Sequence, residues 1–189
     1  MTDDVFPQFP QLESDRLILK EFKPEFWKDI FTLLSDERVS EHETREPFIK
    51  LSQAEQYVKA RLFITRERRE GIIWAISRKE EDDVIGDIGY APHHKLNAEI
   101  GFKLQPAYWN QGLMTEAVLI VVQFLFTETE TLRIEAMTRP KNYGSIKVLE
   151  KCGFQKEGIL RKCEHHQGES WDMGMYSLLK EEFDVNANP

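Results

Sequence analysis

The sequence has 189 residues, enough for one domain of ordinary size, and its 41% hydrophobic and 31% charged residues are typical of a soluble globular protein. Its net charge of -8 argues against nonspecific nucleic-acid binding, and no apolar run is long enough to cross a bilayer. The start MTDDVFPQFP is acidic where an export signal would be basic. We therefore expect one cytoplasmic domain that contacts neither nucleic acid nor membrane.

The first third of the chain predicts a strand and two helices. Residues 1–13 are punctuated by prolines and are expected to form a loosely held arm. Residues 16–22 then alternate as a strand, and an amphipathic helix follows. Ser52 and Glu55 have the spacing of a capping box, which predicts the start of a second helix. Residues 37–48, between the helices, are charged and irregular, and they either line a substrate entrance or form a solvated surface loop.

Three short apolar runs predict the next strands: Gly71 to Ser77, Val84 to Tyr90 and Ala98 to Leu104. Their short connections favour an antiparallel meander. A long helix then leads to another strand, Leu132 to Thr138. Because a crossover helix joins parallel neighbours, the strands on either side of it should lie parallel.

The last part of the chain predicts one helix and two strands. Asn142 can cap a helix that stops at Gly153. Phe154 to Cys163 and Trp171 to Leu179 then form strands, with Gly168 in the turn between them. The pattern as a whole indicates a mixed α/β domain.

The stretch Leu104 to Leu125, LQPAYWNQGLMTEAVLIVVQFL, is the most informative in the chain. A strand ends near Pro106, a short turn follows, and the helix after it is apolar on most sides and therefore buried. Such a turn brings unpaired backbone N–H groups to the positive end of a helix, which suits a phosphate group, and Gly112 would allow close approach. The alternative is a tight connection without a ligand.

Three segments, in this order and at this spacing, resemble the GNAT acetyltransferases: PAYWNQGLMTEA, RIEAMTRPKNYGSIKVLEKCGFQKEG and GESWDMGMYSL. The resemblance covers Leu12 to Leu179 and points to the branch of ribosomal-protein N-terminal alanine or serine acetyltransferases. It implies a single GNAT domain with a core of about residues 12–180. The implied fold is a central mixed sheet of six to seven strands, with an antiparallel N-terminal meander, a parallel pair at the acetyl-CoA cleft and flanking helices.

The resemblance also implies the co-substrate, acetyl-CoA, and the residues that contact it. The strand end and turn that would bind it comprise Phe102, Leu104, Trp109, Asn110, Gln111, Gly112, Leu113, Met114 and Thr115. Asn142 and Ser145, in the pattern NxxS, would meet the pantetheine arm and the reacting sulfur. From the residues alone, both could be purely structural at the start of a helix.

The implied reaction is direct attack of a primary amine on the thioester, without a covalent enzyme intermediate. For the general base the resemblance points to Glu164, with Glu99 and then Glu135 as competitors. Each of the three could equally be an ordinary solvated or salt-bridged carboxylate. A backbone N–H near Phe102 to Leu104 would stabilise the oxyanion.

The leaving thiolate needs a proton or a hydrogen bond, and Ser145 matches the serine that the family places near the sulfur. Because a serine hydroxyl is a poor acid, Ser145 would either protonate the thiolate or only hydrogen-bond it. Tyr143 and Tyr176 are possible substitutes, although packed or surface tyrosines are the commoner explanation.

The acceptor amine is left open. It is the N-terminus of a ribosomal or other protein, or a small amine such as an antibiotic or polyamine, and the enzyme is expected to be a monomer or homodimer. A non-catalytic CoA-binding module is the rival hypothesis. Asn110 and Met114 favour this rival, because the family motif commonly has small residues at these positions.

No metal site is predicted. Adjacent strand residues point to opposite faces, so the pairs His93–His94 and His165–His166 have the wrong geometry for joint ligation, and neither CxxC nor HExxH occurs. His165 and His166 could instead touch the acceptor. Cys152 and Cys163 are too few for a disulfide framework and are expected to be reduced and packed.

Overall fold

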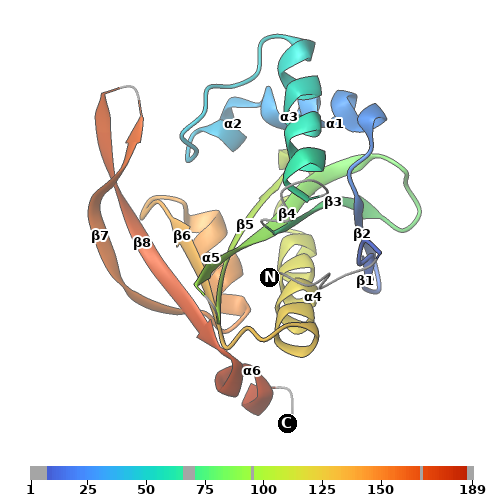
Figure 1. Ribbon diagram of the computed structural model, residues 1–189. Helices are drawn as coiled ribbons and strands as arrows, with labels where there is room; N and C mark the ends of the chain where they lie inside the picture. Colours follow the sequence, from blue (N-terminus) through green and yellow to red (C-terminus); the bar gives the residue numbers. More distant parts are fainter. Residues whose placement is uncertain (1–7, 66–70, 95, 167, 187–189) are drawn as a thin grey trace.

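The computed structural model describes residues 8–65, 71–94, 96–166 and 168–186, which fold around one central sheet (Figure 1). The strands are β1 (Leu12–Glu13), β2 (Leu17–Glu21), β3 (Ile72–Arg78), β4 (Val84–His94), β5 (Asn97–Leu104), β6 (Arg133–Thr138), β7 (Gln155–His166) and β8 (Glu169–Leu179). The helices are η1 (Pro24–Phe26), α1 (Trp27–Leu34), α2 (Glu37–Ser40), α3 (Leu51–Phe63), η3 (Pro106–Tyr108), α4 (Leu113–Glu128), α5 (Tyr143–Lys151) and α6 (Lys180–Asn186). The predicted mixed α/β class is confirmed.

Within the described ranges, eight strands lie in the order β1-β2-β3-β4-β5-β6-β8-β7. Neighbours from β1 to β5 are antiparallel, which confirms the predicted meander. β5 and β6 are parallel, as expected for strands joined through the crossover helix α4. The β7–β8 hairpin completes the sheet with antiparallel pairs and extends beyond the other strands (Figure 1).

The proline-rich start of the chain packs against the sheet. The prediction of a loosely held arm is therefore wrong for residues 8–13, where β1 pairs with β2 and adds a strand to the six to seven expected. The indole N–H of Trp74 donates a hydrogen bond of 2.6 Å to the carbonyl of Pro10, and the ring of Phe9 packs edge-on against Trp74. Residues 1–7 of the arm lie outside the described residues.

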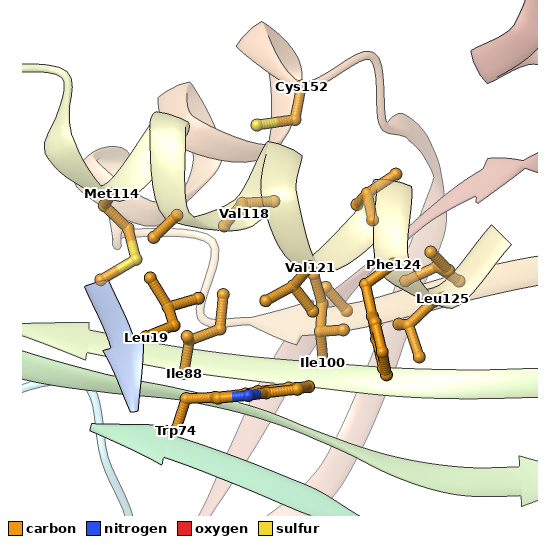
Figure 2. Packing of buried hydrophobic residues seen from close by; sticks show 14 of the residues in the cluster. Leu19, Trp74, Ile88, Ile100, Met114, Val118, Val121, Phe124, Leu125 and Cys152 are labelled. Carbon is orange, nitrogen blue, oxygen red and sulfur yellow. The ribbon is translucent and has the colours of Figure 1, made fainter. Parts of the chain in front are cut away.

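Helices cover both faces of the sheet. α4 lies on one face, where Phe124 contacts Trp74 and Val121 packs toward the strands (Figure 2). α1 and α3 pack together on the other face, against Ala75 among others. Successive strand side chains point to opposite faces, so β3 supplies Trp74 to one core and Ala75 to the other. Among the described residues, no helix has both the length and the apolar character needed to span a membrane.

Helix α3 begins before the predicted capping box. Its N-cap is Lys50, and the side chain of Gln53 accepts hydrogen bonds from the backbone N–H groups of Ile49 and Lys50. Because lysine has no side-chain acceptor, only the Gln53 half of a capping box is formed at this helix start. The predicted Ser52–Glu55 box is wrong.

The two cysteines are free thiols in different surroundings. Cys152 is buried, as expected, and burial raises the pKa of its thiol to about 12, so it is not a thiolate at neutral pH. Cys163 is exposed on β7, and the expectation of a packed position is wrong for it. β7 is an edge strand whose side chains are mostly exposed, which explains the difference.

Trp74→Ala should lower the free energy of unfolding by about 3 to 5 kcal/mol, because a fully buried ring and its hydrogen bond to Pro10 are lost. Chemical denaturation measures the change. Leu119→Ala, on the exposed side of α4, is the control and should shift stability by no more than about 0.5 kcal/mol. Similar losses in the two variants would contradict the central place of Trp74 in the core.

Candidate active site

The parallel strands β5 and β6 separate along their length. Their pairing covers Asn97 to Glu99 on β5, with Glu99 opposite Glu135, and goes no further. The later parts of both strands, residues 100–104 and 136–138, line a cavity of about 680 Å³. Backbone N–H and C=O groups on the facing edges therefore lack a strand partner, and a ligand lying between the strands could pair with them.

The first turns of α4 and α5 close the same cavity. Most of the predicted coenzyme contacts line it: Phe102, Leu104, Trp109, Asn110, Gly112, Leu113, Met114, Thr115, Asn142 and Ser145. Gln111 does not. Its carbonyl accepts a hydrogen bond of 3.1 Å from Arg16, and its side chain donates one of 2.9 Å to the carbonyl of Ala107.

Gly112 sets the geometry of the turn before α4. It is the N-cap residue, with φ of 77°, in the left-handed region that favours glycine. The hydrogen bond that opens the helix runs from the N–H of Glu116 to the carbonyl of Gly112. The N–H groups of Leu113, Met114 and Thr115 precede that bond and lack a partner within the helix, so they can serve an anion.

Met114 leaves this turn open. Its side chain is buried in the core beneath α4 and points toward the strand that carries Leu19 (Figure 2). Met114 lines the cavity but is only 7% exposed, so most of its side chain is packed in the core. The feature that favoured a non-catalytic module therefore has a structural explanation in core packing.

Hydrogen bonds from Ser14 and Arg16 hold the turn before α4, and we call this group the clamp; sequence reasoning missed it. Arg16 donates a hydrogen bond of 2.7 Å from Nε to Glu116 and another from Nη1 to the Gln111 carbonyl, while Ser14 also donates to Glu116. Burial alone would raise the pKa of Glu116, but these hydrogen bonds outweigh it and lower the pKa. The pairs are about 100 residues apart in sequence, and no local pattern signals them.

Asn142 caps α5, as predicted. Its side-chain oxygen accepts a hydrogen bond of 3.1 Å from the N–H of Ser145, and both residues line the cavity. The tyrosines proposed as substitutes for Ser145 lie elsewhere. Tyr143 is 69% exposed and Tyr176 is buried in the core, and neither lines the cavity. Ser145 is one of the hydroxyl-bearing residues that line the cavity, together with Tyr108, Thr115 and Thr138.

The three candidate carboxylates share one region but have different surroundings. Glu135 is held by Arg133 Nε at 2.7 Å and by His93 Nδ1 at 3.0 Å. Burial would raise the pKa of Glu135, but these partners lower it overall. For Glu99, burial raises the pKa, the negative charges of Glu135 and Glu164 raise it further, and His93 opposes them. Glu99 directly precedes the first cavity-lining residue of β5.

Part of the irregular segment 37–48 faces the cavity. Its first residues form the short helix α2, and Glu41, His42 and Glu43 line the cavity opposite β5. Lys103 of β5 lies 3.1 Å from Glu43 and 3.6 Å from Asp87. Burial would lower the pKa of Lys103, but these carboxylates raise it above its usual value. The sequence singled out neither Lys103 nor His42.

The histidines do not form a metal site in the described part of the chain. His93 contacts Glu135, and His166 Nε2 lies 3.3 Å from Glu46. Nowhere in that part do three or more His, Cys, Asp or Glu side chains come together in an arrangement that could hold a metal ion. His166 lines a second, neighbouring cavity together with Glu41 and Glu43, and His165 is exposed.

Residues 16–155 match the family model described as the acetyltransferase (GNAT) domain. The chain belongs to the GNAT acetyltransferase family. It is 34% identical over 175 residues to the uncharacterized N-acetyltransferase YoaA of Bacillus subtilis (strain 168), covering 91% of this chain and 98% of the relative. These matches identify it as an acetyl-CoA-dependent N-acetyltransferase.

Solved structures confirm the predicted GNAT fold. A GNAT-family acetyltransferase from Bacillus anthracis superimposes with a TM-score of 0.81 at 25% identity, covering 91% of this chain and 99% of the other. RimL, a ribosomal L7/L12 alpha-N-protein acetyltransferase solved with coenzyme A, superimposes with a TM-score of 0.78 over 90% of this chain and 98% of RimL. At 16% identity, the likeness to RimL shows the fold alone.

Proposed function

We propose that this GNAT enzyme binds acetyl-CoA between β5, β6 and the first turns of α4 and α5, and that it acetylates the N-terminal amine of a protein. The separation of β5 from β6 after Glu99 and Glu135 carries the proposal. It leaves a cavity whose walls are strand edges with free backbone groups and whose ends are helix starts.

The residues present fit the coenzyme. The N–H groups at the start of α4 suit its diphosphate, and Lys147 and Lys151 add positive charge on the α5 side of the cavity. The free strand edges suit the amide groups of an extended pantetheine arm. When bound, acetyl-CoA supplies an activated acetyl thioester, and the chain binds it, orients it and moves the protons.

We assign the general base to Glu99 ahead of Glu164 and Glu135. Glu99 lies where the strands part, and its raised pKa brings it closer to the pH at which it must accept a proton. Glu135 already accepts hydrogen bonds from Arg133 and His93, and these lower its pKa, so it is a poorer base. Glu164 acts on Glu99 through its charge.

Ser145 is proposed to hydrogen-bond the leaving sulfur, because its residue lines the cavity at the start of α5. A thiol has a pKa only slightly above neutral pH, so the sulfur of coenzyme A can leave as a thiolate. A hydrogen bond from the Ser145 hydroxyl is then enough to stabilise it. Backbone N–H groups of Phe102 to Leu104 are the proposed donors to the acetyl oxygen, because this part of β5 has no β6 partner.

We place the acceptor amine beside segment 41–48, and call this the acceptor side. Its carboxylates suit a positively charged acceptor. Glu41 and Glu43 line both the main cavity and a neighbouring one of about 330 Å³. A protein N-terminus is supported by the fold shared with RimL, the ribosomal L7/L12 alpha-N-protein acetyltransferase. A small amine such as a polyamine or antibiotic is the alternative, because it carries the same charge.

Release of the free thiol from acetyl-CoA tests the acceptor class. Peptides beginning with Ala or Ser should be acetylated with higher kcat/KM than free lysine, spermidine or an aminoglycoside, because the proposed acceptor is an N-terminal amine. Higher kcat/KM for spermidine or the aminoglycoside would establish the alternative. Tight coenzyme A binding without thiol release above background for any acceptor would instead establish a non-catalytic binding module.

Gly112→Ala should weaken acetyl-CoA binding about tenfold, because a side chain strains the left-handed backbone at φ 77° and moves the N–H groups of the turn. Gly168→Ala is a matched control, since Gly168 has φ of 80° and a Cβ there would meet nothing within 4 Å. It lies in the β7–β8 turn and should keep its affinity. Isothermal titration would contradict the coenzyme site if Gly112→Ala bound normally.

Glu99→Gln should lower kcat about 100-fold at neutral pH, because the amine loses its proton acceptor. In the wild type, kcat should fall as pH drops through the raised pKa of Glu99, since the carboxylate must be ionised to act. This fall of kcat at low pH should be absent in Glu99→Gln and should remain in Glu164→Gln. A larger effect of Glu164→Gln on the pH profile would restore Glu164 as the base.

A further inference from the structure

Three segments that are distant in sequence meet on the acceptor side. They are segment 41–48, which follows α2, the tip of the β7–β8 hairpin, and the connection from β6 to α5 (Figure 1). Figure 1 shows the hairpin rising beside the chain that leaves α2. The β6–β8 ladder, which ends with Thr138 opposite Gly174, brings the connection close to the hairpin. Segment 41–48 belongs to no strand, so side chains fix its position relative to the other two.

Arg139, in the connection from β6 to α5, contacts both other segments. The centre of its guanidinium lies 3.9 Å from the ring centroid of Trp171 on β8, and its Nη1 donates a hydrogen bond of 2.8 Å to the carbonyl of Glu41. An arginine can stack on an aromatic ring and donate in its own plane at the same time, which lysine cannot do. One side chain thus joins the hairpin to segment 41–48.

The same segment is tied down at two further points. Glu46 lies 3.3 Å from His166 Nε2, and the ring of His166 packs edge-on against Trp171. Glu43 pairs with Lys103 of β5. Trp171 therefore contacts both Arg139 and His166. Arg139 binds segment 41–48 at Glu41, and His166 binds it at Glu46.

The segment held in this way is the wall between two cavities. Glu41 and Glu43 line both the main cavity and the neighbouring cavity of about 330 Å³, which is also lined by His166 and Trp171. Arg139 itself lines neither. It can therefore influence an acceptor only through the groups it holds.

We propose that Arg139 is a positioning residue for the acceptor amine, because its stacking on Trp171 and its bond to Glu41 fix the acceptor-side wall. This rests on the proposed function, in which the acceptor enters from that side. The coenzyme lies against other residues, so acetyl-CoA binding should not depend on the Arg139 side chain.

Steady-state kinetics on the full chain, with acetyl-CoA and an Ala-initiated peptide, test the proposal. Arg139→Ala should raise KM for the peptide about tenfold with little change in kcat, because a stacked and hydrogen-bonded contact is lost. Arg139→Lys should recover part of the loss, and Trp171→Ala should resemble Arg139→Ala. The loss in the double variant should be smaller than the sum of the two single losses, since both single variants break the stacking contact.

Arg161→Ala is the control, because Arg161 is an exposed arginine on the same hairpin. Its KM for the peptide and its affinity for acetyl-CoA should equal those of the wild type. An unchanged peptide KM in Arg139→Ala would overturn the proposal. So would equal losses of peptide and acetyl-CoA binding, because they would indicate a general structural role.

Hydrogen exchange gives a readout that does not need turnover. Arg139→Ala should speed amide exchange in segment 41–48 and leave α4 unchanged, whereas unaltered exchange in the segment would contradict the proposed link. If the wild type acetylates no amine, the proposed function fails. The rate of amide exchange in segment 41–48 still tests, without any acetylation, whether Arg139 fixes that segment.

Discussion

The arrangement of this protein depends on the point at which β5 and β6 stop pairing. Parallel strands normally continue their ladder, because an unpaired backbone group costs free energy unless water or a ligand satisfies it. Here the ladder ends at Glu99 and Glu135. The strand edges beyond it become part of a binding surface that does not depend on particular side chains.

Helix α4 fixes the other half of that surface. Its buried side chains hold it against the sheet over most of its length, so the position of its first turn is set by the core (Figure 2). Met114 belongs to both parts, because its side chain packs in the core while its N–H lies at the turn. Stability and ligand binding are thus built from the same few residues, which leaves little freedom to alter one alone.

Local chemistry made much of this predictable from the sequence. The crossover from β5 through α4 to β6 follows from hydrophobic spacing, and the cap at Asn142 follows from one side chain and its own helix. Contacts between distant segments were not predictable. Arg16 meets Glu116, and Arg139 meets Trp171, only because the fold brings them together.

The choice among carboxylates shows the same limit. Sequence resemblance placed Glu164 first, whereas the base that we propose, Glu99, differs from the others in a pKa that its burial and the charges of Glu135 and Glu164 raise. Neither burial nor register can be read from one chain. The capping box at α3 failed for a simpler reason, since the helix begins after Lys50, and lysine is not a residue that predicts an N-cap.

The clamp of Arg16 on Glu116 has a mechanical consequence. Arg16 directly precedes β2, near one edge of the sheet, while Glu116 lies in the first turns of α4, next to the proposed coenzyme site. Any ligand that steadies the turn also steadies this edge, by thermodynamic linkage. The N-terminal edge of the sheet and the proposed diphosphate site are therefore one cooperative unit, although 100 of the 189 residues separate Arg16 from Glu116.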